Sequence, residues 1–198
     1  ALAAASHSGE PFHVAGVRTI LGRAGLGDGA LQTPPDWPLD PEAARALVRA
    51  GGAAARITMN CSGKHAAMLL TCVVNGWDLA TYREPEHPLQ RALLAEVERL
   101  AGEPVVTAGV DGCGAPVFAV SLVGLAQAFR ALVLAGHDAP ERRVADAMRA
   151  HPEWVGGTTR DVTALMLGVP GLVAKEGAEA VYAAALPDGR AVALKIDD

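Results

Sequence analysis

The chain has 198 residues, of which 51% are hydrophobic and 20% are charged, and its formal net charge is −5. This length and composition predict one substantial globular domain, or a large and a small one. The acidic balance and the lack of a basic run argue against nucleic acid or an anionic membrane surface as the main partner. No apolar stretch is long enough to span a bilayer. Three scattered cysteines do not make a disulfide framework, so we expect a reducing, cytoplasmic setting.

Apolar periodicity and capping signals predict most of the helices. Ser6 or Ser8 is expected to cap the first helix, Asp40 the second, and Asn75-Gly76 to end the third. A proline-rich loop is expected over residues 33–38. The predicted helices span residues 11–23, 41–50, 63–75, 88–100, 121–134, 140–149 and 160–167.

Strand signals lie mainly near the two ends of the sequence. We expect strands over residues 105–110, 172–175, 180–186 and 190–196, a strand-like run over 1–5, and a hairpin turn at Pro187-Asp188-Gly189. This order predicts an α/β (α+β) fold: a sheet packed by helices, with a helical part over roughly 36–150. Both ends interrupt apolar segments, so we expect the sequence to belong to a longer chain that is cut at both ends.

The stretch Asn60-Cys61-Ser62-Gly63-Lys64-His65 holds a thiol, a hydroxyl, an amine and an imidazole just before an apolar helix. Polar groups this dense are costly to bury unless they bind something. Cys61 fits a nucleophile with His65 as its base. It equally fits a zinc ligand with Cys113 as its partner, although the spacing matches no standard zinc motif. A third interpretation makes Cys61 a small core residue and Lys64 a solvated lysine.

The segment Asp111-Gly112-Cys113-Gly114 follows a predicted strand. Loops at strand ends often hold ligands, and the glycines allow a close approach to the backbone. Asp111 is a candidate partner for a substrate ammonium group. A tight turn around a buried thiol explains the same residues.

Two further candidates lie near the ends of the sequence. Ser6-His7-Ser8 places two hydroxyls beside an imidazole, which fits either catalysis or helix capping. Lys175 lies in an apolar strand, where it is either a charge that protects a sheet edge or a desolvated catalytic amine. Cys72 is expected in the core.

Taken in order, these motifs resemble the asparaginase II family, the zinc-containing L-asparaginases of the rhizobial type. The matching segments cover nearly the whole chain: residues 5–10, 60–65, 111–114, 173–178 and 192–198. The resemblance implies a fold like that of serine β-lactamases and glutaminases, in a single domain over 1–198 that lacks its amino-terminal segment. It also implies hydrolysis of L-asparagine to L-aspartate and ammonia by a cytoplasmic homodimer.

The resemblance also implies roles for individual residues. Zinc is the expected cofactor, and its ligands are expected to be Cys61, Lys64 and Cys113. Ser6 and Lys175 correspond to catalytic residues, and the residues expected near the substrate are Asn60, His65 and Asp111. The family's nucleophile lies in an upstream Ser-x-x-Lys motif, which this sequence does not contain. We therefore expect the attacking serine to lie outside these residues.

Two other functions stay open at this point. One is a cysteine hydrolase that uses Cys61 with His65. The other is a zinc- or amino-acid-binding fragment without catalytic activity.

Overall fold

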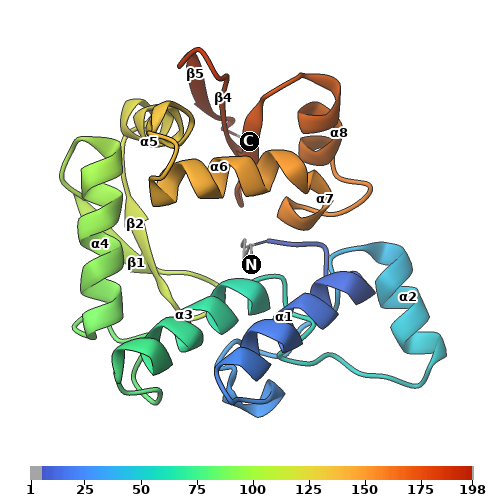
Figure 1. Cartoon of the computed structure of the whole chain (residues 1–198). Helices are drawn as coiled ribbons and strands as arrows, with labels where there is room; N and C mark the ends of the chain where they lie inside the picture. Colours follow the sequence, from blue (N-terminus) through green and yellow to red (C-terminus); the bar gives the residue numbers. More distant parts are fainter. Residues whose placement is uncertain (1–5, 198) are drawn as a thin grey trace. The chain divides into compact units, whose positions relative to one another are not determined.

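The computed structural model describes residues 6–197 and has a mixed helix and strand architecture (Figure 1). The α+β class predicted from the sequence is confirmed. The helices are α1 (Pro11–Arg23), the 3-10 turn η1 (Asp28–Ala30), α2 (Pro41–Arg49), α3 (Ser62–Asn75), α4 (Pro88–Ala101), α5 (Leu122–Leu134), α6 (Pro140–Ala150), α7 (Pro152–Val155) and α8 (Asp161–Gly168). The strands are β1 (Thr107–Val110), β2 (Pro116–Ala119), β3 (Val173–Glu176), β4 (Val181–Ala185) and β5 (Ala191–Lys195).

Capping residues set some of the helix boundaries, close to where the sequence predicted them. Asp40 accepts a hydrogen bond from the Ala43 amide at 2.7 Å, which satisfies a free amide at the start of α2. Gly76 ends α3 in the left-handed conformation, with φ +67°. The predicted serine cap on α1 is wrong: Glu10 is the N-cap and makes no side-chain cap bond. Proline at the first helical position starts α1 instead, because its φ is already helical.

The strands form two small antiparallel sheets among the described residues. β1 pairs with β2, and β2 is a strand that the sequence analysis missed. The second sheet has the order β3-β4-β5, with Lys175 opposite Ala183 and Val181 opposite Lys195. The predicted hairpin turn at residues 187–189 joins its last two strands. The strand-like run predicted for residues 1–5 lies outside the described residues.

The chain divides into two compact units. The described part of the first comprises residues 6–92 and 110–117. Its core forms where α1 lies along α3 (Figure 1), and it includes the buried side chains of Val17, Leu21, Leu69 and Tyr82. Burial of apolar side chains such as these stabilises each by about 1.5–3 kcal/mol. This core fixes the amino-terminal end of α3, where the cysteine motif begins.

The second unit comprises residues 93–109 and 118–197 of the described chain. Its core lies between helices α5, α6 and α8 and the three-stranded sheet. The fully buried members include Val155, Val162, Val173 and Ala174. The sequence analysis did not place α7, a single turn that closes the loop before α8. Every helix in the described part of the chain falls short of the length and hydropathy that a membrane span requires.

Candidate metal and catalytic site

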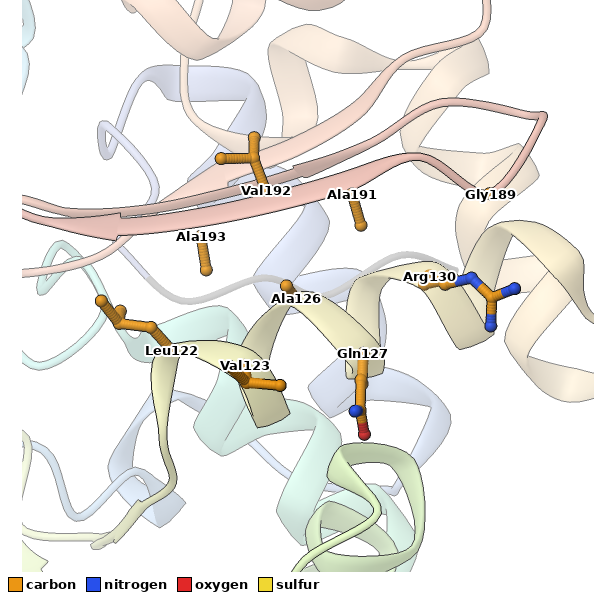
Figure 2. Close-up of a pocket in the computed structure, with 9 residues that line it drawn as sticks. All are labelled: Leu122, Val123, Ala126, Gln127, Arg130, Gly189, Ala191, Val192 and Ala193. Carbon is orange, nitrogen blue, oxygen red and sulfur yellow. The ribbon is translucent and has the colours of Figure 1, made fainter.

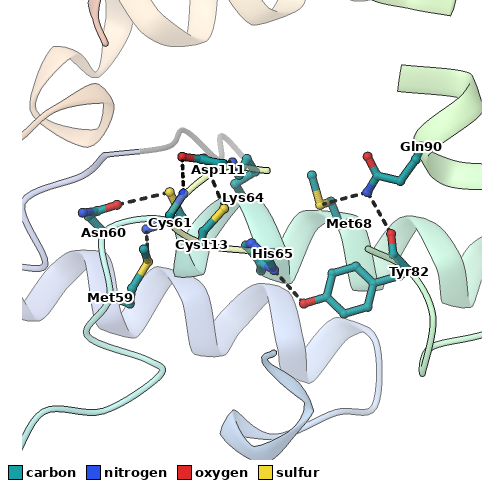
Figure 3. A network of polar contacts seen from close by, with 11 residues as sticks. Met59, Asn60, Cys61, Lys64, His65, Met68, Tyr82, Gln90, Asp111 and Cys113 are labelled. Carbon is teal, nitrogen blue, oxygen red and sulfur yellow. Dashed lines mark hydrogen bonds and ion pairs between the residues drawn. The ribbon is translucent and has the colours of Figure 1, made fainter. Parts of the chain in front are cut away.

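Two segments of the first unit, far apart in the sequence, bring four reactive side chains together (Figure 3). Cys61 is the N-cap of α3 and Lys64 lies in the first turn of that helix, while Asp111 and Cys113 lie in the turn between β1 and β2. The Asp111 Oδ2 atom is 3.1 Å from Lys64 Nζ and 3.2 Å from Cys113 Sγ. One ligand atom from each of Cys61, Asp111 and Cys113 lies within 4.8 Å of the others. The structure therefore brings Cys61, Lys64, Asp111 and Cys113 together.

The two buried thiols of this cluster interact with each other. A hydrogen bond between them raises the pKa of Cys61 and lowers the pKa of Cys113, so one thiol keeps its proton while the other carries the charge. The imidazole of His65, the backbone amide of Ala115 and the charge of Lys64 also help to lower the pKa of Cys113, against the effect of burial. A buried thiolate with this much support is suited to bind a soft metal ion.

Lys64 is the positive charge of the cluster. Burial disfavours its ammonium form, but the charges of Cys61, Cys113 and Asp111 outweigh that effect and raise the pKa of Lys64. Without a metal, the ammonium thus neutralises the acidic groups around it. A lysine amine coordinates a metal only after it loses its proton, and the charge of a bound metal favours that loss.

The donor set fits a zinc ion. Zinc favours thiolate sulfur and accepts carboxylate oxygen or a neutral amine as further ligands. Here two free thiols are joined by a hydrogen bond. The Lys64 ammonium, which is paired with Asp111, already places a positive charge beside them. Cys61, Cys113 and Asp111 or Lys64 would hold the ion.

A buried polar chain lies behind this cluster. His65 and Tyr82 are fully buried, and His65 Nδ1 is 2.6 Å from the Tyr82 hydroxyl. The same hydroxyl accepts a hydrogen bond from the Gln32 amide at 3.3 Å. The Gln90 side-chain amide donates to the Tyr82 carbonyl oxygen at 2.8 Å, which fixes the tyrosine backbone. Tyr82 therefore determines the orientation of the imidazole (Figure 3).

Asn60 and Met59 hold Cys61 from the other side. The Asn60 Oδ1 atom lies 3.1 Å from Cys61 Sγ, and Met59 Sδ accepts the Cys61 backbone N–H at 3.1 Å. The Asn60 side chain is half-buried. It lies beside the cluster, and its predicted place near a substrate stays a prediction.

The segment Ser6–Gly9 is attached to the start of α3. The His7 amide donates to the Asn60 carbonyl oxygen at 3.1 Å, and the Ser6 backbone also hydrogen-bonds to Cys61. His7 Nδ1 accepts from the Gly9 amide at 3.1 Å, so Nε2 is assigned the proton and donates to Ser62 Oγ at 3.1 Å. His7 thus anchors the segment, and Ser6 lies next to the cysteine cluster.

The second unit holds the other predicted catalytic residue. Lys175 lies on β3 with its side chain mostly buried. Its Nζ donates to the Glu176 carbonyl oxygen at 2.6 Å and lies 3.1 Å from Glu176 Oε2. Burial lowers the pKa of Lys175, and Glu176 opposes that shift. A desolvated lysine of this kind is suited to proton transfer.

A comparison with known protein families identifies the family of this chain. The family model described as L-asparaginase II matches residues 1–198, the whole of this sequence. The chain belongs to the L-asparaginase II family. A search of the curated proteins gave no match.

Neither of two cavities in this L-asparaginase II chain contains a predicted site residue. In the second unit, an open groove of about 460 Å³ lies between α5 and β5 and is mainly apolar (Figure 2). In the first unit, a groove of about 720 Å³ lies between α1 and α2 and is also mainly apolar. The polar chemistry of the chain lies elsewhere, so cavity size does not locate the candidate site.

Sequence reasoning missed several residues that support the candidate site. Tyr82 lies in a loop without a motif. The one feature of the sequence that could have drawn attention to it is the rarity of tyrosine, of which the chain has two. Glu176 stands within the matched 173–178 segment, but its contact with Lys175 depends on how the strand ends. Arg160 contacts the same carboxylate from a distant part of the sequence.

Proposed function

We propose that this protein is an amidohydrolase that converts L-asparagine to L-aspartate and ammonia by serine acyl transfer. The observation that carries the proposal is the family match over residues 1–198. It is supported by the close approach of the Cys61 and Asp111–Cys113 segments, which the sequence separates by some fifty positions. Zinc, a cytoplasmic location and a homodimer are further parts of the prediction.

In this proposal the nucleophile is a serine of a Ser-x-x-Lys motif outside the printed residues. The buried serines near the cluster are poor substitutes. Ser62 is fully buried, and its hydroxyl donates to the Ile57 carbonyl oxygen at 2.9 Å while it accepts from His7. Ser8 is also buried. These positions favour a supporting role for both hydroxyls.

Ser6 and Lys175 are the proposed proton carriers. The amine leaving an amide needs a proton, and the attacking hydroxyl must lose one. The half-buried Ser6 lies beside the cysteine cluster, and the lowered pKa of Lys175 favours its neutral form as a base. We propose that the attacking serine loses its proton to the lysine of its own motif, and that Ser6 and Lys175 carry a proton to the departing ammonia.

Cys61, Lys64 and Cys113 are the proposed zinc ligands, with Asp111 as an alternative to Lys64. Bound zinc supplies a fixed positive charge that organises the pocket. Asn60 and Asp111 are partly exposed at its edge and are suited to bind the amide and ammonium groups of the substrate. His65 is proposed to act on the substrate site through its neighbour Cys113, since its Nδ1 is used by Tyr82.

The cysteine-hydrolase alternative receives less support from these contacts. A nucleophilic thiol needs a lowered pKa, but the pKa of Cys61 is raised by its hydrogen bond with Cys113. The proposed base, His65, is oriented by Tyr82.

The test is the release of ammonia and aspartate by the intact protein, with L-glutamine as the comparison substrate. Hydrolysis of L-asparagine with kcat/KM well above that for L-glutamine supports the proposal. Absence of both activities in a folded, zinc-loaded sample contradicts it and favours the binding module.

A further inference from the structure

A buried group of charges lies at the end of β3 in the second unit. Glu176 is the last residue of the strand and is only 9% exposed. Carboxylates are rarely this buried unless they are paired. Arg160, directly before α8, and Lys175, the preceding residue of the strand, supply the two positive partners.

The Glu176 carboxylate joins these two cations. Its Oε1 atom forms an ion pair with Arg160 Nη2, and its Oε2 atom lies 3.1 Å from Lys175 Nζ. Consecutive side chains of a strand normally point to opposite faces of the sheet. Here the two head groups meet because β3 ends at Glu176, where Gly177 begins the turn to β4. The carboxylate thus holds the lysine amine at a defined position.

We propose that Glu176 is a positioning residue for Lys175 and that Arg160 is the counter-charge that holds the Glu176 carboxylate in place. Together they fix the position of Lys175 Nζ for proton transfer. The inference rests on the proposed catalytic role of Lys175.

The surrounding charges predict that removing Glu176 and removing Arg160 have opposite effects on the pKa of Lys175. Burial lowers the pKa of Lys175, Glu176 and Asp161 act against that shift, and Arg160 adds to it. Tyr182 faces Glu176 from β4 across the strand pair.

Helix α6 also packs against β3, but its nearby charges are paired with each other. Arg149 donates to the Gly171 carbonyl oxygen at 2.8 Å and contacts Asp146 at 3.0 Å. Loss of the Glu176 charge should therefore move the pKa of Lys175 down, and loss of the Arg160 charge should move it up.

The experiment uses Glu176→Gln and Arg160→Gln in the intact protein. Lysine side chains are labelled with 15N and 13C, and the pKa of Lys175 is followed by NMR. The sequence has three lysines, so a Lys175→Arg variant assigns the signal, and the exposed Lys195 serves as an internal comparison. Asp188→Asn is the matched control, because it removes an exposed ion pair with Arg190 from the same sheet.

We expect opposite shifts of the Lys175 pKa in the two variants and no shift in the control. We also expect kcat to fall roughly tenfold to a hundredfold in Glu176→Gln, with little change in KM, because a misplaced catalytic group slows the chemical step. The pH profile of kcat should move in the same direction as the NMR pKa in each variant.

Shifts of the same sign in both variants, or none, would overturn the inference. If Glu176→Gln does not fold, Arg160→Gln alone decides the result, since the Arg160 side chain is 27% exposed and tolerates substitution better. The NMR result does not depend on activity. Opposite NMR shifts without any change in asparagine hydrolysis would contradict the positioning role, and Lys175→Ala separately tests the catalytic role on which it rests.

Discussion

The imidazole of His65 and the phenol of Tyr82 form a 2.6 Å contact inside the first unit, and both side chains are fully excluded from solvent. The contact connects the motif on α3 to a loop seventeen residues later in the sequence. Because it leaves the other side of the imidazole for Cys113, it determines how the candidate metal site is supported.

Loss of the Tyr82 hydroxyl should therefore affect both stability and metal binding. In Tyr82→Phe the buried His65 nitrogen loses its partner, which should lower the free energy of unfolding by about 1–3 kcal/mol. Because His65 also hydrogen-bonds to the proposed ligand Cys113, loss of its orientation should weaken zinc binding by about 10–100-fold. Urea unfolding and competition with a fluorescent chelator measure the two effects. Thr71→Ala is the control. It removes an exposed hydroxyl from α3, the helix that carries His65, and should leave zinc affinity unchanged.

The two thiols of the cluster should be protected by the metal. In the zinc-loaded protein, Cys61 and Cys113 should resist alkylation, and a chelator should make both reactive. Cys113 should react first, because its pKa is the lowered one. Mass spectrometry after alkylation measures this, with Cys72→Ala as the control. Rapid modification of Cys61 in the zinc-loaded protein would instead favour a nucleophilic cysteine.

Asp111 and Lys64 can be distinguished as ligands by their effects on metal affinity. If Lys64 is a ligand, Lys64→Met should reduce zinc affinity by more than about 100-fold, beyond the loss expected for a group that only orients a ligand. Asp111→Asn should then reduce zinc affinity by a smaller factor. Isothermal titration with zinc gives both values. The reverse order would assign the third position to Asp111.

Lys175→Ala should abolish most asparagine hydrolysis and leave the protein folded. Removal of a general acid or base usually costs about 10²–10⁴-fold in rate. Ammonia release at saturating substrate measures the loss, and circular dichroism checks the fold. Lys195→Ala is the matched control, because Lys195 is exposed on β5, the far edge strand of the same sheet. Retained activity in Lys175→Ala would remove Lys175 from the mechanism.

The cap of α2 offers a prediction about stability alone. Asp40→Ala removes the acceptor for the Ala43 amide and should lower the free energy of unfolding by about 0.5–2 kcal/mol. Asparagine hydrolysis should be unchanged at temperatures where the variant is folded. Thermal unfolding compared with Asp40→Asn, which keeps an acceptor oxygen, checks that the hydrogen bond is the cause.

Local signals predicted the helices well because their causes are local. The Asp40-Pro41 start and the Asn75-Gly76 end each depend on neighbouring residues, and the structure has them where the sequence predicted. The short strand β2 was missed because its four residues follow a glycine-rich turn and are half exposed, which gives no clear alternation. Its pairing with β1 is a property of the folded chain.

For the candidate site, the sequence predicted the residues that lie in motifs and missed those that support them. Cys61, Lys64 and Cys113 were predicted together from their motifs and the family resemblance, and their side chains do lie together. Tyr82 could not be found in this way, because its role arises only when a loop folds against α3. The role of the Glu176 carboxylate could not be predicted either, because it depends on an ion pair with Arg160. Arg160 lies sixteen positions earlier and reaches Glu176 only through the packing of α8 on β3.

Ser6 has a φ of +61°, a left-handed conformation that costs a residue with a side chain about 1–2 kcal/mol. A glycine at this position would relieve that cost and stabilise the protein, yet it would delete the hydroxyl. Sequences selected only for thermal stability should therefore drift towards glycine here, while sequences selected for catalysis should keep the strained serine. With the catalytic role proposed for Ser6, position 6 is thus a place where the demands of folding and of chemistry point to different amino acids.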